Sequence, residues 1–380
     1  MIATIPFNKP YLTGDELGNI AEAHDAGQLA GDGQFTSYCS QWLVQHTDCS
    51  RALLTHSCTA ALEMAAILIN IQLGDEVIMP SYTFVSTANA FVLQGAVPVF
   101  IDIRPDTLNI DETLIESAIT SKTKAIVPVH YAGVACEMDV IMEIADRHDL
   151  FVIEDAAQGV LARYKGRPLG SIGHLGCYSF HETKNIISGE GGALLINDPL
   201  LSERAEIIRE KGTNRSKFLR GGVDKYTWVD VGSSYLPGEI ISAFLWAQMQ
   251  SAYKITSIRL KIWNNYHSAF DYLEKKGRVQ RPVIPDDCKH NAHMYYLILH
   301  SPQDRLAFIE FMKEKGIACL FHYIPLHDSP QGSKSGRSAG NLACTNELAS
   351  RLVRLPLWVG LEEFQAKVIE LAIAYLDETI

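Results

Sequence analysis

The sequence lacks paired cysteines, long apolar runs and an excess of positive charge. Its eight cysteines are scattered over 380 residues without a C-x-x-C pair, which favours reduced thiols over a zinc site or a disulfide framework. No apolar stretch approaches the roughly 18 residues that a membrane span requires. The N-terminal segment MIATIPFNKPYL lacks the basic and apolar regions of a signal peptide. These absences predict a cytoplasmic location.

The formal net charge of −11 argues against a nucleic acid or an anionic membrane as a partner, because both attract positively charged proteins. An anionic substrate therefore requires a local cluster of positive side chains. The content of 47% hydrophobic and 20% charged residues is typical of a soluble globular enzyme. A chain of this length fits one large domain and a smaller one.

Short apolar runs alternate with helical patterns from Ala52 onward. We expect strands at residues 52–55, 76–79, 97–102, 125–130, 150–155, 177–180 and 193–196. We expect helices at 59–69, 85–93, 112–119, 137–147 and 201–211. This alternation predicts an α/β fold with a mostly parallel, seven-stranded sheet that helices cover on both faces. Ligands bind such sheets at the carboxyl ends of the strands.

The flanking regions are less regular. Residues 1–50 indicate an irregular arm, one helix at about 14–26 and a glycine-rich turn at 29–35, which either approaches a ligand or only connects two elements. After a helical stretch at 237–272, we expect strands at 294–299 and 318–323, a Gly/Ser-rich loop at 332–340, and helices at 305–315, 344–352 and 361–376. We therefore predict a large domain, residues 1–255, and a small C-terminal α/β domain, residues 256–380.

Two stretches of the large domain contain the candidate catalytic residues. In VIEDAAQG an apolar strand ends at Asp155, and in SFHETKNIISGEGGALLI a single lysine, Lys184, follows a strand and precedes a run of glycines. A lysine and an aspartate placed in this way suit pyridoxal 5′-phosphate (PLP). The lysine forms a Schiff base with the aldehyde, and the carboxylate keeps the pyridine nitrogen protonated. The alternatives are a surface lysine and a helix-capping aspartate.

A phosphate site is expected where the first strand meets its helix. Ser57, Cys58 and Thr59 place small residues at the start of this helix, where free N–H groups and the helix dipole attract anions. The hydroxyl of Ser179 could join them, although ordinary N-capping would produce the same pattern. Phe84 also opens a helix, and its ring could stack on a flat cofactor or pack in the core.

The segment at 215–236 is polar and aromatic, and it is the longest loop that we expect in the large domain. Long loops in compact domains are often functional. Its Arg215, Lys217, Arg220 and Lys225 could bind a diphosphate or form a solvated surface.

Several motifs together resemble one family of enzymes. They are SFHETKN with GEGG, EDAAQ, SCTAALEMA, PSYTFVSTANAF, FHYIPLH and RLPLW, and they extend almost from end to end of the chain. They are similar to motifs of the DegT/DnrJ/EryC1/StrS sugar aminotransferases, which have the PLP-dependent transferase fold of type I, as in aspartate aminotransferase. The resemblance therefore implies this fold and PLP as the cofactor.

The resemblance also implies roles for individual residues. Lys184 matches the Schiff-base lysine, Asp155 the partner of the pyridine nitrogen, and Gln158 the residue beside the phenolic oxygen. The phosphate contacts match Ser57, Cys58, Thr59 and Ser179, and the aromatic residue over the ring matches Phe84. Two positions depart from the family pattern. Cys58 replaces a common glycine, and Ser234 replaces an asparagine that reaches the phosphate of a partner subunit.

The implied reaction is amino transfer between L-glutamate and a dTDP-ketosugar. Runs such as VPVHYAGVACEMD and DKYTW resemble members that convert dTDP-4-dehydro-6-deoxy-D-glucose to the 4-amino-4,6-dideoxygalactose derivative for enterobacterial common antigen. The gluco epimer and a non-catalytic, sugar-sensing protein remain alternatives. A homodimer with sites at the subunit interface is expected. Side chains that could contact substrate or serve only structure are Phe35, His181, Tyr226, His322 and His327; no metal is expected.

Overall fold

The computed structural model describes residues 5–379, and its centre is an eight-stranded sheet. From edge to edge the strands are β1 (Arg51–Thr55), β9 (Gly192–Ile196), β8 (Leu175–Ser179), β5 (Phe151–Asp155), β4 (Thr123–Ile126), β2 (Glu76–Pro80), β3 (Val97–Ile101) and β12 (Arg337–Ser338). Strand β9 is antiparallel to β1 and β8, and the other neighbouring pairs are parallel. The seven predicted strands are all present. The eighth, β12, comes from the segment in which we expected a Gly/Ser-rich loop.

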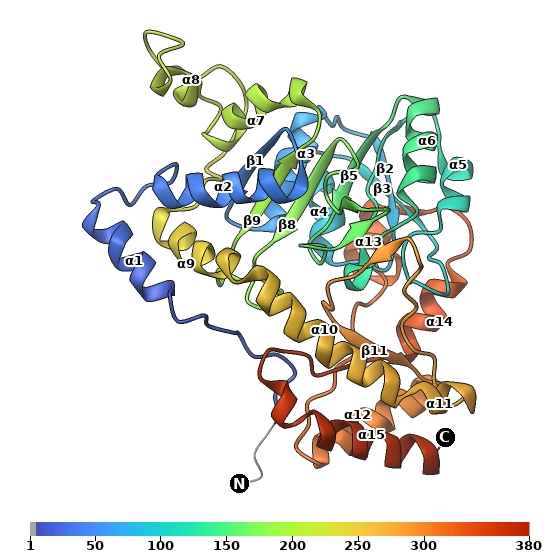
Figure 1. Cartoon of the computed structure of the whole chain (residues 1–380). Coiled ribbons are helices and arrows are strands. Elements are labelled where there is room, and N and C mark those ends of the chain that lie inside the picture. Colours follow the sequence, from blue (N-terminus) through green and yellow to red (C-terminus); the bar gives the residue numbers. More distant parts are fainter. Residues whose placement is uncertain (1–4, 380) are drawn as a thin grey trace.

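Helices cover both faces of this sheet (Figure 1). One face packs against α2 (Gln34–Thr47), α6 (Met138–His148) and α9 (Glu239–Gln250), and the other against α3 (Cys58–Leu68), α4 (Val85–Val92) and α7 (Ser202–Arg209). Successive residues of a strand point to opposite faces. Val152 of β5 therefore enters one hydrophobic cluster and its neighbour Ile153 the other. This two-sided burial explains why the strands read as continuous apolar runs.

Short elements complete the larger part of the molecule. They are α1 (Glu16–Asp25), α5 (Ile115–Ala118), α8 (Arg215–Leu219), the 3₁₀ helices η1 (Glu112–Leu114), η2 (Tyr131–Gly133) and η3 (Pro199–Leu201), and the strands β6 (Arg163–Tyr164), β7 (Arg167–Pro168) and β10 (Cys288–Lys289). The last three strands form a separate small sheet. Among the described helices, none is both long and apolar enough to cross a membrane.

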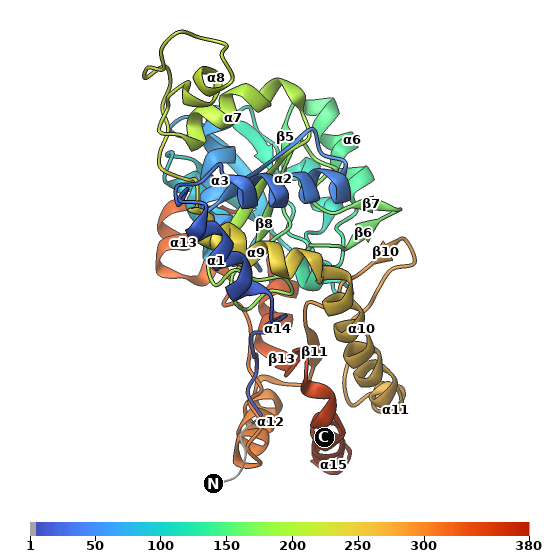
Figure 2. The same ribbon diagram turned by 60° about the vertical axis from the view of Figure 1, so that its left-hand side comes forward.

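The C-terminal part lies below the sheet in Figure 1 and again in Figure 2. It contains α10 (Ala252–Ala269), α11 (Asp271–Lys275), α12 (Pro302–Glu314), α14 (Ala343–Arg351), η5 (Leu361–Glu363), α15 (Gln365–Thr379) and the antiparallel pair β11 (Tyr295–Ile298) and β13 (Leu352–Leu355). The segment with η4 (Leu326–Asp328) and α13 (Pro330–Ser335) instead returns to the sheet, where Leu326 joins its core and α13 lies against β3. Helix α10 belongs to both parts, since Ile255 packs in the core of the sheet and Ile262 in the C-terminal core. A domain boundary at residues 255 and 256 stays a prediction.

Two expectations about local structure were wrong. The N-terminal region contains a second helix, α2, whose first N–H groups are satisfied from far along the chain: Glu239 accepts bonds from the N–H groups of Gly33, Phe35 and Thr36 at 2.8–3.2 Å. A capping group some 200 residues away leaves no local sequence signal. The strand expected at 318–323 is instead irregular, with an isolated bridge at Leu320.

Candidate active site

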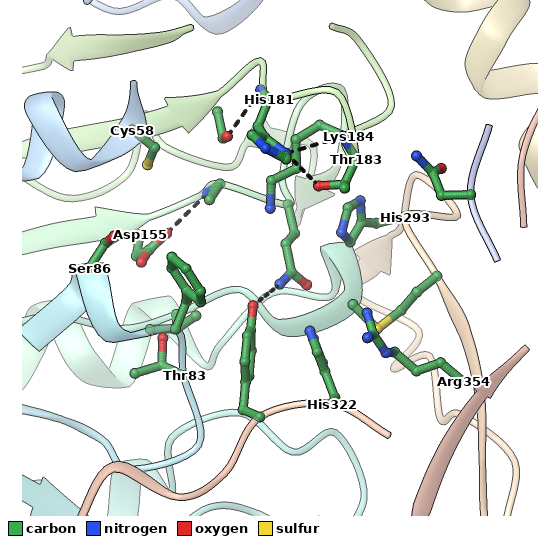
Figure 3. Close-up of a pocket in the computed structure, with 18 of the residues that line it drawn as sticks. Cys58, Thr83, Ser86, Asp155, His181, Thr183, Lys184, His293, His322 and Arg354 are labelled. Atoms are coloured by element: carbon green, nitrogen blue, oxygen red, sulfur yellow. Dashed lines mark hydrogen bonds between the residues drawn. The ribbon is translucent and has the colours of Figure 1, made fainter. Parts of the chain in front are cut away.

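A cavity of about 660 Å³ opens at the carboxyl ends of β5 and β8. The C-terminal part supplies its opposite wall, with residues from Arg259 onward. Figure 3 shows the side chains that line it. Ten residues predicted from the sequence are among them: Ser57, Cys58, Thr59, Phe84, Asp155, Gln158, Ser179, His181, Lys184 and His322.

Lys184 lies in the turn between β8 and β9, and its side chain enters the cavity. Its N–H donates to the carbonyl of His181 at 2.9 Å, and the next residue, Asn185, donates through Nδ2 to the carbonyl of Asn291 at 2.7 Å. Burial lowers the pKa of the Lys184 amine, and the nearby Arg354 guanidinium lowers it further, while Cys58 and Asp155 oppose the shift. An uncharged amine is a nucleophile and a base, so burial prepares Lys184 for both tasks.

Asp155 and Glu154 are adjacent carboxylates with different surroundings, because they point to opposite faces of β5. Asp155 lines the cavity, where it accepts a hydrogen bond from the Thr87 hydroxyl at 2.7 Å and another from the Ala157 N–H at 3.1 Å. Glu154 is fully buried away from the cavity, and its oxygens accept bonds from His130 and three backbone N–H groups. Asp155 is therefore the carboxylate that can reach a ligand.

The N-terminus of α3 forms one end of the cavity. Ser57 caps this helix by accepting a bond from the Ala60 N–H at 3.1 Å, which leaves the earlier N–H groups of Cys58 and Thr59 for a ligand. Strand β9 passes directly behind, at Gly192, where a Cβ would overlap the backbone of Ser57. The glycine of the GEGG motif thus allows a close approach of two backbones beside a potential anion site.

Gln158 and Phe84 are both neighbours of Tyr323. Gln158 is fixed at both ends, because its Oε1 accepts from the Ala132 N–H at 2.6 Å and its Nε2 donates to the Tyr323 hydroxyl at 2.9 Å. The ring of Phe84 stands 6.2 Å from that of Tyr323 and remains 56% exposed at the start of α4. An exposed aromatic ring at the rim of a cavity can cover a flat ligand.

Two histidines of the predicted set line the cavity in different environments. His181 is half-buried, and its Nδ1 lies 2.9 Å from the Thr183 hydroxyl. His322 Nδ1 lies 2.8 Å from the hydroxyl of the fully buried Tyr131, and burial holds the pKa of this histidine well below its ordinary value. His322 is therefore neutral near pH 7, which suits it to hydrogen bonding rather than to charge pairing.

Four other predicted residues do not line this cavity. Phe35 is buried among α1, α2 and α9, where it packs with Ala243, so a direct contact with substrate in this chain is excluded. His327 lies outside the lining with its Nδ1 2.6 Å from the Ser81 hydroxyl. Tyr226 and Ser234 are exposed in the segment that follows α8. Neither residue lines the cavity of its own chain. Ser234 is bridged to Glu210 after α7, and the next residue, Tyr235, accepts a hydrogen bond from the His56 N–H at 3.1 Å.

Several lining or supporting residues were missed by sequence reasoning. Thr87 holds Asp155, and Tyr323 holds Gln158. Arg259, His293 and Arg354 line the wall that faces the sheet. Tyr323 and Arg354 stand within the motifs FHYIPLH and RLPLW, so the sequence contained a signal for both. Arg259 lies in an ordinary helical pattern that offered none.

Comparisons with known proteins agree with this geometry. Residues 10–373 match the model of the DegT/DnrJ/EryC1/StrS aminotransferase family. The spore coat polysaccharide biosynthesis protein SpsC of Bacillus subtilis is 32% identical, over 94% of this chain and 93% of that protein. The GDP-perosamine synthase of Caulobacter vibrioides is 31% identical, over 98% and 97%.

The fold also matches solved structures. A putative sugar aminotransferase of Streptococcus pneumoniae, Spr1654 in its PMP form, has a TM-score of 0.91 and 25% identity, covering 99% of this chain and 100% of that one. The same protein has also been solved in a PLP form. The family model spans nearly the whole chain, and the predicted type I fold is confirmed. This chain therefore belongs to the DegT/DnrJ/EryC1/StrS aminotransferase family.

Proposed function

We propose that this protein is a PLP-dependent nucleotide-sugar aminotransferase. It converts dTDP-4-dehydro-6-deoxy-D-glucose and L-glutamate to dTDP-4-amino-4,6-dideoxy-D-galactose and 2-oxoglutarate, for the synthesis of a cell-surface polysaccharide. The observation that carries this proposal is a lysine of lowered pKa and a buried aspartate in one cavity, Lys184 and Asp155. Relatives named for polysaccharide biosynthesis and for GDP-perosamine synthesis support a sugar nucleotide as the acceptor.

The residues around the cavity fit PLP. Asp155 is a buried acceptor for a protonated ring nitrogen, and the start of α3 offers N–H groups to a phosphate. Ser179, at the end of β8, adds a hydroxyl. Lys184 offers an amine to the aldehyde. PLP is also the cofactor predicted from the sequence. The similar structure of Spr1654 has been solved in PLP and PMP forms, which supports the same cofactor.

Different residues of this chain have different roles in the reaction. PLP, when bound, supplies an aldehyde that condenses with amines and a ring that accepts electrons from the carbon losing its proton. Asp155 keeps the ring nitrogen protonated, and Thr87 fixes the orientation of its carboxylate. Lys184, once the amine of the donor has displaced it, takes a proton from the α-carbon of the donor. Its lowered pKa makes the free amine more available for this step than that of an exposed lysine.

A homodimer is part of the proposal. The segment after α8 exposes Tyr226, Trp228, Val229 and Val231, and Trp228 is 78% exposed. Such an apolar stretch on a protruding arm is typical of a surface that another subunit covers. In a dimer, this arm could bring Tyr226 and Ser234 to the cavity of the partner. Light scattering of the purified protein should give twice the monomer mass; a monomer would contradict this part of the proposal.

The reaction is tested with reconstituted enzyme, L-glutamate and a panel of dTDP- and UDP-ketosugars. We expect more than one equivalent of 2-oxoglutarate per active site to form only with a dTDP-4-keto-6-deoxy sugar, and the coupling constants of the product to show the galacto configuration. A gluco product would replace the assigned epimer. Lys184→Ala should abolish turnover. Release of 2-oxoglutarate at the normal rate by that variant, or repeated turnover of glutamate by wild type with no ketosugar, would overturn the assignment.

A further inference from the structure

The cavity wall that faces the sheet contains two arginines, Arg259 and Arg354, although the chain carries a net charge of −11. Figure 3 shows Asp155 on one side of Lys184, and His293, His322 and Arg354 on the other. Arg259 of α10 lines the same cavity. A ligand bound between these walls therefore has its acidic groups attracted away from Asp155 and toward the two arginines.

Arg354 is held in place by contacts other than ion pairs with acidic side chains of the described part of the chain. It stands at the end of β13, and its Nε and Nη2 donate to the carbonyl of Phe321 at 3.2 and 2.9 Å. Its guanidinium also stacks over the ring of Phe7, 4.6 Å from the ring centre. A guanidinium has five N–H donors, so more than half of those of Arg354 remain for a ligand. Arg354 lines the same cavity as Lys184 (Figure 3).

Arg259 is more unusual, because it is only 4% exposed and no carboxylate of the described residues 5–379 forms an ion pair with it. Its Nε and Nη2 donate to the carbonyls of Ala292 and His293 at 3.1 and 2.7 Å, and burial lowers its pKa to about 9. By contrast Arg209, 3% exposed, pairs with Asp32 at 2.6 Å. A buried charge without a counterion is costly in free energy. An anion in the cavity would compensate the charge of Arg259.

We propose that Arg354 and Arg259 bind the two carboxylates of a dicarboxylic amino-acid donor. Arg354 takes the α-carboxylate, since it lines the cavity with three N–H donors that the Phe321 carbonyl does not use, and Arg259 takes the carboxylate of the side chain. The pair thereby selects glutamate over neutral amino acids. This assignment rests on the proposed aminotransferase function, but binding of a dicarboxylate can be measured without any turnover.

The first test measures binding of glutarate, a dicarboxylate without an amine, to the holoenzyme by calorimetry. Loss of a hydrogen bond to a charged group costs about 10- to 100-fold in affinity. We expect Arg259→Met and Arg354→Met each to weaken glutarate binding by about this factor, and Arg259→Lys to weaken it less. Arg305→Met is the matched control, because Arg305 also lacks an acidic partner but lies outside the cavity. It should bind glutarate as wild type does.

The second test separates the roles of the two arginines in a single turnover with L-glutamate or L-glutamine, followed by the loss of visible absorption. Arg259→Met should reduce the preference for glutamate over glutamine, whereas Arg354→Met should slow both amino acids. Unchanged glutarate affinity in both variants would overturn the proposal. The same calorimetry is done with dTDP as ligand. If the variants lost affinity for dTDP but not for glutarate, the arginines would belong to the nucleotide site, and the proposal would be overturned. If wild type reacts with no amino acid, the proposed function fails, while glutarate binding still tests the pair.

Discussion

Replacing Glu154 by glutamine should destabilise the fold, whereas replacing its neighbour Asp155 by asparagine should impair only the chemistry. Each carboxylate oxygen of Glu154 accepts two hydrogen bonds. Oε1 accepts from Ile172 and Gly173 N–H groups, both at 2.6 Å, and Oε2 from Gly170 N–H at 2.7 Å and His130 Nε2 at 2.8 Å. The ring nitrogen of His130 is a donor here, because its Nδ1 accepts from the Cys136 N–H.

A glutamine amide must place its NH₂ group against two of these four donors, whichever way it turns. Two hydrogen bonds to a charged acceptor are then lost, at about 1.5–3 kcal/mol each, so the free energy of unfolding should fall by about 3–6 kcal/mol. Asparagine at 155 keeps an oxygen for the Ala157 N–H, and its NH₂ can donate to the Thr87 hydroxyl, which rotates. We expect a loss of about 1 kcal/mol or less there.

Urea denaturation followed by circular dichroism measures both effects. The midpoint for Glu154→Gln should fall with little change in the slope m, because the surface exposed on unfolding is the same. Asp155→Asn should unfold like wild type but lose transaminase activity. Wild-type stability of Glu154→Gln, or equal destabilisation by both substitutions, would refute the assignment of the two carboxylates to opposite sides of β5.

Two further predictions concern Lys184 and the potential phosphate site at the N-terminus of α3. In apoprotein, trinitrobenzenesulfonate should label half of Lys184 at a pH below about 10.4, the ordinary pKa of lysine. The reason is that desolvation disfavours the charged amine. If Lys184 were labelled over the same pH range as exposed lysines, its pKa would not be lowered. Gly192→Ala should weaken PLP binding at least about tenfold, since the new Cβ would displace the Ser57 backbone at the N-terminus of α3. Titration of apoprotein with PLP measures this, with Gly18→Ala, which meets no atom, as the control.

The sequence predicted the elements that depend on local pattern. Seven apolar runs became the seven main strands, and the helices between them followed at nearly the expected bounds. Asp155 and Lys184 were found because Asp155 ends a buried strand, Lys184 follows another within a few residues, and the carboxyl ends of β5 and β8 meet at one edge of the sheet. The same reasoning missed α2, whose cap is the distant Glu239.

Contacts between segments far apart in the chain determined the features of the site that local sequence patterns did not predict. Phe35 stands in a glycine-rich turn that suggested a ligand contact, but its burial beside Ala243 of α9 depends on how two helices pack. Arg259 carries no motif, and only the fold brings this residue of α10 to the cavity that also contains Lys184. The sequence by itself determined the order of strands and helices and the cofactor chemistry, because both follow from local periodicity and residue type. Only the tertiary structure determined which charges lack partners, since pairing depends on residues that are far apart in the chain.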